Sequence, residues 1–214
     1  MQHGAILLCG GQSSRMGRDK ASLDFGGETM LQRIVRLVSQ VVNPSSIVVV
    51  ASSHQVIPEL PTSVRVARDR QTGRGPLEGF AAGLRVLQPQ CESIFLTSCD
   101  SPRLVPEFVE RMFKMREKAE IAVPFDGHYE YPLAAVYRTS ILSHVDSQLN
   151  ENRLSLRSLF DRVSTLRIPT DSLRDVDPNL TTLENLNSPE DYQKALSEMG
   201  FAKDRDSDRS RFLT

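Results

Sequence analysis

The sequence predicts an α/β fold in which helices cover both faces of a mainly parallel sheet, and three observations support this. Short apolar runs rich in β-branched residues alternate with stretches of helical spacing along most of the 214 residues. A glycine-rich loop directly follows the first apolar run, and an aspartate follows the fourth. In parallel α/β sheets, segments of this kind lie at the carboxyl ends of strands, where ligands bind.

The predicted strands are short apolar runs between polar residues, glycines and prolines. The second of them is Ile47-Val48-Val49-Val50, a run typical of a strand that is buried on both faces of a parallel sheet. In chain order, the predicted strands cover residues 5–8, 47–50, 64–66, 94–96, 120–123, 133–137 and 164–168.

The predicted helices lie between these strands, and their apolar residues fall on one side of a helix. Pro44 ends the first helix, Pro106 stands early in the third, and Ser188 caps the last. In chain order, the predicted helices cover residues 29–42, 79–87, 106–119, 140–149, 154–160 and 189–199. The alternation predicts a Rossmann-like three-layer sandwich that forms one domain over residues 1–202. We expect the charged tail, residues 203–214, to be disordered.

Composition narrows the class of protein further. Hydrophobic residues make up 39% of the chain and charged residues 25%, which is typical of a globular domain. The net charge of −1 gives no global attraction for nucleic acid, and no apolar run is long enough to cross a membrane. The three cysteines, Cys9, Cys91 and Cys99, lie in or beside apolar runs. We therefore expect a cytoplasmic protein with reduced, buried thiols.

The loop from Gly10 to Lys20 has the composition of a phosphate-binding segment. It contains Gly10, Gly11 and Gly17 together with cationic residues such as Arg15 and Lys20. Glycines allow close backbone approach to a phosphate, and the cations can neutralise its charge. The glycine spacing matches neither a Walker A loop nor a dinucleotide-binding fingerprint. The alternative is a polar surface turn.

Asp100 directly follows the fourth predicted strand in the segment Cys99-Asp100-Ser101-Pro102. A carboxylate at this edge of the sheet could hold Mg²⁺, which prefers oxygen ligands beside substrate phosphates. The alternative is an aspartate that caps the following helix.

Two further segments are candidates for ligand contacts. The loop from Gly73 to Gly79 could close over a base or ribose, or it could simply connect a strand to a helix. Asp69 precedes it and could bind a ribose hydroxyl or pair with a neighbouring arginine. Near the C-terminus, Asn185 and Asn187 offer amides to a polar ligand such as a pterin, although simple helix capping is the alternative.

These segments together resemble the molybdenum cofactor guanylyltransferase (MobA-type) family within the nucleotidyltransferase superfamily. The opening motif, L-x-G-G-x-S-x-R-M-G-x-D-K, is highly specific and begins at Leu8. The motifs G-P-L-x-G, C-D-[ST]-P, P-L-x-x-V-Y and N-x-N-[ST]-P-E-[DE] follow in the family's order. The resemblance spans residues 6–192 and implies the fold of the nucleotide-diphospho-sugar transferases.

The resemblance implies a GTP site and a metal site. The guanine and ribose pocket would be lined by backbone groups of Leu8, Cys9, Gly10 and Gly11. The triphosphate would be held by Arg15 and Lys20, with Gly17 letting the loop wrap it. The rest of the guanosine would contact Asp69, Gly75, Pro76, Leu77 and Gly79, and Mg²⁺ would bind Asp100.

The resemblance also implies a second substrate and a reaction. Molybdopterin would contact Asn185, Asn187 and Arg153 or Arg157. Arg15, Lys20 and Asp100 would support transfer of GMP from GTP to Mo-molybdopterin with release of pyrophosphate. Other molybdenum-cofactor proteins and recipient apo-enzymes would be partners, and neither nucleic acid nor membrane would be.

Two features bear on the base that is transferred. Gly11 and the Gly75-Pro76-Leu77 segment favour GTP over CTP, because the related cytidylyltransferases usually differ at both places. Cys9 replaces the small alanine usual in the family. Two other functions stay open: a sugar-1-phosphate nucleotidyltransferase, and a non-catalytic GTP-binding chaperone of the cofactor.

Overall fold

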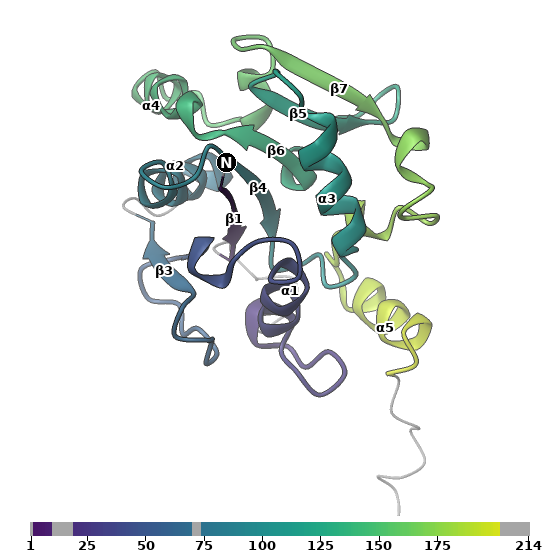
Figure 1. The fold of residues 1–214 in the computed structure, drawn as a ribbon. Helices are drawn as coiled ribbons and strands as arrows, with labels where there is room; N and C mark the ends of the chain where they lie inside the picture. The colour runs from purple at the N-terminus through teal and green to yellow at the C-terminus, as the bar shows by residue number, and fades with distance from the viewer. Residues whose placement is uncertain (1, 10–18, 70–73, 202–214) are drawn as a thin grey trace, which may run out of the picture.

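The computed structural model describes residues 2–9, 19–69 and 74–201, and these residues build a seven-stranded sheet with helices on both faces (Figure 1). The order of the strands across the sheet is β3-β2-β1-β4-β6-β5-β7. Their bounds are β1 His3–Leu8, β2 Ile47–Ala51, β3 Arg65–Arg68, β4 Ser93–Ser98, β5 Ile121–Phe125, β6 Ala135–Arg138 and β7 Thr165–Pro169.

The sheet is mainly parallel, as predicted. Among its strands only β6 is antiparallel, and it lies between β4 and β5. The connection from β5 to β6 is short and contains no α-helix, and a parallel crossover needs a dozen or more residues. Parallel pairing aligns Leu8 at the end of β1 with Val50 on one side and Ser98 on the other. The carboxyl ends of β1, β2 and β4 therefore meet at one edge.

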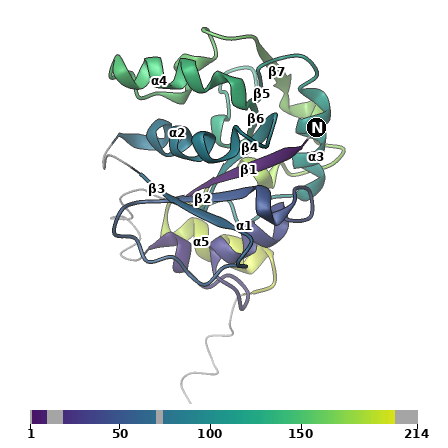
Figure 2. The same ribbon diagram turned by 60° about the vertical axis from the view of Figure 1, so that its left-hand side comes forward.

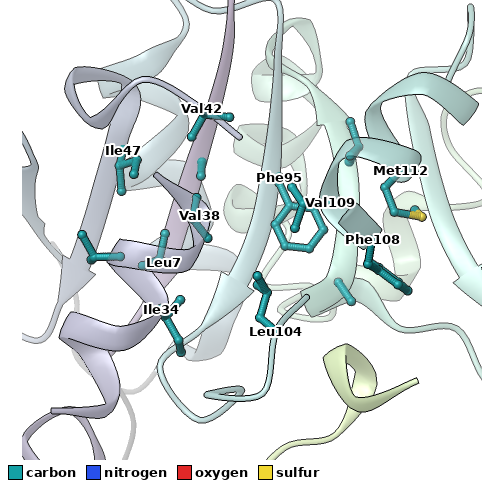
Figure 3. Packing of buried hydrophobic residues seen from close by; sticks show 14 of the residues in the cluster. Leu7, Ile34, Val38, Val42, Ile47, Phe95, Leu104, Phe108, Val109 and Met112 are labelled. Carbon is teal, nitrogen blue, oxygen red and sulfur yellow. The ribbon is translucent and has the colours of Figure 1, made fainter. Parts of the chain in front are cut away.

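The helices form the two outer layers of the sandwich. Their bounds are α1 Met30–Val38, α2 Gly75–Leu87, α3 Pro106–Met115, α4 Leu142–Asn150 and α5 Pro189–Glu198. Helices α1 and α3 pack on one face against Leu7 and Phe95 (Figure 3). Helices α2 and α4 pack on the other face against Ile6 and Leu96. Successive side chains of a strand point to opposite faces, so one apolar run supplies both cores. The Rossmann-like three-layer prediction is confirmed.

Capping residues explain where helices α1 and α5 begin. Thr29 and Gln32 form a reciprocal capping box at the start of α1, and Ser188 and Asp191 form another at the start of α5. The predicted cap at Ser188 is confirmed. Helix α5 lies beside α1 in both views, and its Ala195 packs in a small separate cluster with Met30 (Figures 1 and 2).

Some of the predicted helix boundaries were wrong. Helix α2 begins at Gly75 and not at Gly79, because Pro76 suits the first helical turn, where its missing N–H costs nothing. The predicted helix over residues 154–160 is only a short 3-10 helix, Leu156–Leu159. Helices α1 and α3 end about one turn earlier than predicted.

Two remaining predictions concern membrane-spanning helices and the C-terminal tail. Within the described ranges, no helix has the length and apolar character needed to cross a membrane. The predicted tail over residues 203–214 lies outside the described residues.

Candidate active site

The predicted site residues that the structure describes come mainly from the carboxyl edge of the sheet. Cys9 directly follows β1, Asp69 directly follows β3, and Asp100 lies two residues beyond β4. Four predicted residues, Gly10, Gly11, Arg15 and Gly17, lie outside the described residues.

Lys20 and Asp100 form an ion pair at this edge. The Nζ atom of Lys20 lies 3.1 Å from Oδ2 of Asp100, and the two side chains are 17% and 18% exposed. Lys20 opens the 3-10 helix η1, Lys20–Ser22, whose Ala21 is fully buried. The N-cap of α3 is Val105, so Asp100 does not cap that helix, which was the alternative to a ligand role.

The Asp100 carboxylate and backbone are fixed by neighbouring segments. The Ser98 hydroxyl donates to Oδ1 of Asp100 at 2.5 Å, and the Leu186 N–H donates to the Asp100 carbonyl at 2.8 Å. The Ser101 hydroxyl donates to Oδ1 of Asn185 at 2.8 Å. The turn after β4 is therefore joined to the segment before α5 by backbone and side-chain bonds.

Asn187 contributes a second polar group beside Lys20. The Nζ atom of Lys20 donates to Oδ1 of Asn187 at 3.2 Å. The backbone N–H of Asn187 donates to Asp191, and such bonds lower the pKa of that carboxyl. Capping is thus performed by Ser188 and Asp191, while the Asn187 side chain faces the Lys20–Asp100 pair.

Cys9 and Cys99 are buried thiols on adjoining strand ends. The Cys9 N–H donates to the Val50 carbonyl at 2.8 Å, and the Cys99 N–H donates to the Leu8 carbonyl at 3.0 Å. A hydrogen bond with Cys99, together with burial, raises the pKa of Cys9 well above its usual range. Both thiols are free, in agreement with the predicted buried, reduced cysteines.

Asp69 and Gly79 meet at the start of α2. A Cβ on Gly79 would lie 3.2 Å from Oδ1 of Asp69 and 3.1 Å from Cδ2 of Leu8, so glycine permits this close approach. Burial, and then the nearby Glu78 carboxylate, raise the pKa of Asp69. Oδ1 of Asp69 is buried and has no hydrogen-bond partner among the residues that the structure describes.

The rest of the predicted G-P-L-x-G loop lies in the first turn of α2. Gly75 has φ +68°, a value that favours glycine, and Pro76 follows it in the first turn. The Leu77 side chain is fully buried in the core beneath α2.

A small pocket of about 80 Å³ opens between the β5–β6 connection and the segment before α5. Tyr129, Tyr131 and Asn185 are among its lining residues. Arg157 stacks on Tyr129 with its guanidinium 3.6 Å from the ring centroid. Arg153, by contrast, pairs with Glu151, and no hydrogen bond or ion pair in the described structure joins it to Lys20, Asp100 or Asn187.

Sequence reasoning missed Gln55, which lies in the loop after β2. Its amide nitrogen donates to the Cys9 carbonyl at 3.0 Å and to both carboxylate oxygens of Asp19 at 2.9 Å. The available signal was position, because a polar side chain just past the carboxyl end of a central strand belongs to the ligand edge.

A mainly parallel sheet with an aspartate just beyond one strand end, paired with a lysine, has the architecture of a nucleotide-binding α/β protein. The family model for the MobA-like NTP transferase domain matches residues 5–166. The chain belongs to this family of nucleotidyltransferases.

Relatives of the chain carry consistent names. It is 34% identical over 198 residues to a probable molybdenum cofactor guanylyltransferase of Mycobacterium avium, a match that covers 90% of this chain and 94% of the relative. A protein of the same name from Mycobacterium tuberculosis is 34% identical over 189 residues, covering 86% and 91% of the two chains.

Solved structures support the fold. The molybdopterin-guanine dinucleotide biosynthesis protein A of Archaeoglobus fulgidus superposes with a TM-score of 0.76 at 21% identity, covering 94% of this chain and 100% of that one. The 4-diphosphocytidyl-2C-methyl-D-erythritol synthase of Anaerococcus prevotii superposes with a TM-score of 0.65 at 14% identity, covering 93% and 96%.

Proposed function

We propose that this chain is a molybdenum cofactor guanylyltransferase, which transfers GMP from GTP to Mo-molybdopterin. A terminal phosphate oxygen of molybdopterin attacks the α-phosphorus of GTP. The bond from that phosphorus to the bridging oxygen breaks, and pyrophosphate leaves. The names of relatives that match over about nine-tenths of the chain favour this reaction.

The observation that carries the proposal is the Lys20–Asp100 pair, with 3.1 Å between Nζ and Oδ2. Phosphoryl transfer of this kind needs little covalent chemistry from the protein, so positioning and charge neutralisation do most of the work. An ammonium at this edge suits the leaving pyrophosphate, and a carboxylate beside it suits a divalent cation. Arg15, which lies outside the described residues, would add a second cation for the triphosphate.

The residues present fit Mg²⁺ as the implied metal. Asp100 is partly exposed and offers hard oxygen ligands, and Mg²⁺ in such sites uses one or two carboxylates together with substrate phosphates. Asp100 would hold the ion, which would neutralise charge on the phosphates when bound. Lys20 would hold the β- and γ-phosphates, and Ser98 would keep the Asp100 carboxylate oriented.

The guanosine would lie between the ends of β1 and α2. Leu8 and Cys9 would line its pocket, and Gly10 and Gly11 of the adjoining loop would present backbone groups to it. Gly17 would let that loop wrap the triphosphate. Oδ1 of Asp69, which has no hydrogen-bond partner within the described ranges, suits a ribose hydroxyl or another donor of the nucleoside. Gly79 would leave room for that contact, and Gly75, Pro76 and Leu77 would form the wall of the pocket.

Molybdopterin would lie on the side of Asp100 that faces α5. Asn187 already contacts Lys20, and Asn185 joins the Asp100 turn to the pocket beside Tyr131. Arg153 or Arg157 would supply positive charge, and the position of Arg157 over Tyr129 at that pocket favours Arg157.

The deciding experiment is label transfer with purified protein, Mg²⁺, Mo-molybdopterin and α-labelled GTP, with α-labelled CTP in parallel. Label that enters a pterin dinucleotide from GTP alone supports the proposal. Label from CTP instead overturns the choice of base. Labelled GTP that binds without transfer favours the non-catalytic chaperone, and transfer to a sugar 1-phosphate favours the sugar nucleotidyltransferase. Omission of Mg²⁺ with excess chelator should abolish transfer.

A further inference from the structure

Gln55 joins the end of β1 to the short helix that carries Lys20. Its amide nitrogen contacts three acceptor atoms: the Cys9 carbonyl oxygen at 3.0 Å and the two Asp19 carboxylate oxygens, each at 2.9 Å. Cys9 and Asp19 are the described residues on either side of residues 10–18. We infer that Gln55 is a positioning residue that holds Lys20 in place against Asp100. The inference rests on the proposed function of that pair.

Gln55 is connected to Lys20 through Asp19 and the 3-10 turn that Asp19 caps. Asp19 is the N-cap of the 3-10 helix η1, and its Oδ1 atom accepts a hydrogen bond from the Ala21 N–H at 3.0 Å. Ala21 is fully buried and anchors this turn in the core. Lys20 lies between the cap and the anchor, and its Nζ atom reaches Asp100. A shift of the Asp19 carboxylate therefore moves the residue that bears the ammonium.

The position of Gln55 itself is fixed by the sheet. Its Oε1 atom accepts from the Ser52 N–H at 3.3 Å, which orients the amide nitrogen toward Cys9 and Asp19. Arg68, at the end of β3, donates to the backbone carbonyls of Ser52 at 2.8 Å and Gln55 at 2.7 Å. Strands β2 and β3 thus hold the loop, and the loop holds the Lys20 turn.

The acceptor atoms around the Gln55 amide nitrogen are best satisfied by an uncharged group with two N–H donors. The partners of the amide nitrogen are a carbonyl and a carboxylate, both acceptors, and a neutral amide can donate one hydrogen to each. Methionine has a similar length but no N–H donor. Glutamate would place a second carboxylate against Asp19, and two carboxylates at this distance favour uptake of a proton.

The test compares Gln55→Met and Gln55→Glu with wild type in GMP transfer. We expect kcat/KM for GTP to fall about 10- to 100-fold in both variants, the scale of a misplaced catalytic group. Gln40→Glu is the matched control, since Gln40 is exposed and lies beyond the C-terminal end of α1. It makes the same change of charge and should behave as wild type.

The pH dependence of activity distinguishes a loss of positioning from a general loss of structure. Among the described residues, the charged groups bonded to Gln55 are the Asp19 carboxylate and, through the loop backbone, Arg68. In Gln55→Glu, activity relative to wild type should recover as the pH falls, because a shared proton restores one bridge to Asp19. In Gln55→Met the deficit should not change with pH. Thermal unfolding checks that each variant is folded.

Binding of a fluorescent GTP analogue keeps this inference distinct from the proposed function. If wild type transfers no GMP but binds the analogue, the proposed function fails, and roughly tenfold weaker binding by Gln55→Met still supports the positioning role. Folded Gln55→Met with wild-type kcat/KM and wild-type affinity would overturn the inference. Binding of the analogue by neither protein would overturn it as well.

Discussion

Replacement of Lys20 by methionine should separate catalysis from stability. At 3.1 Å between Nζ and Oδ2, Coulomb's law with an effective dielectric constant of 20 gives about 5 kcal/mol of attraction to Asp100. Both charges lose hydration when they pair at 17% and 18% exposure, so the net contribution to folding is on the order of 1 kcal/mol. The same ammonium acting on phosphate charge in the transition state is worth about 3 kcal/mol. We therefore expect a loss of at least about 100-fold in GMP transfer from a protein that stays folded.

The assay measures pyrophosphate release under saturating acceptor, and urea unfolding gives the free energy of unfolding of the same samples. Lys114→Met is the matched control, because Lys114 forms an exposed i,i+4 pair with Glu110 at 3.5 Å on α3. The control loses a cation and an ion pair but should retain full turnover. Folded Lys20→Met protein with turnover within about threefold of wild type would refute the assignment of Lys20 to the transferring phosphates.

Three further predictions concern Gly79, Asp69 and the buried thiols. Gly79→Ala should leave the free energy of unfolding nearly unchanged, because a gain of about 1 kcal/mol in helix propensity offsets the crowding of Leu8 and Asp69. The affinity for GTP, measured by calorimetry, should nevertheless fall several-fold. Burial raises the pKa of Asp69, so its ionised form opposes folding as the pH rises above the ordinary value of 3.8. Asp69→Asn should therefore raise the unfolding midpoint at neutral pH, with a gain that fades as the pH falls toward 3.8, and should weaken GTP binding. Because the pKa of Cys9 is raised, Cys9 and its neighbour Cys99 should react with iodoacetamide only slowly until urea unfolds the protein, and fast labelling of the folded protein would contradict this.

The layers of the fold follow from the sequence because strands buried on both faces consist of continuous apolar runs. Val48 and Val49 point to opposite cores, and only an apolar residue fits at each. The direction of β6 was harder to predict, since apolar periodicity carries no information on strand direction. A signal was present in the polar turn at Asp126-Gly127-His128, because a short connection without a helix can only join antiparallel neighbours.

The candidate site was predictable in part. The ends of strands could be located from the sequence, so the loop from Gly10 to Lys20 and Asp100 were placed at the ligand edge for a physical reason. The contact of Lys20 with Asn187 joins segments 167 residues apart, and no local pattern encodes it. Gln55 was missed because its role depends on the partners of its amide nitrogen, Cys9 and Asp19, which are 46 and 36 residues away.

The connections around Asp100 imply that acceptor binding and catalysis are coupled in this site. The carbonyl of Asp100 accepts from the Leu186 N–H, and the flanking asparagines bond to Ser101 and Lys20. A ligand that moves the segment before α5 must therefore also move Lys20 and Asp100, the groups proposed to hold the triphosphate and its metal ion. Because a shift of about 1 Å at a reacting centre costs on the order of 100-fold in rate, correct seating of the pterin substrate can decide how fast the nucleotide reacts. Selection of the acceptor would then be expressed in kcat as well as in KM, even though the acceptor and GTP lie on different sides of Asp100 in the proposed site.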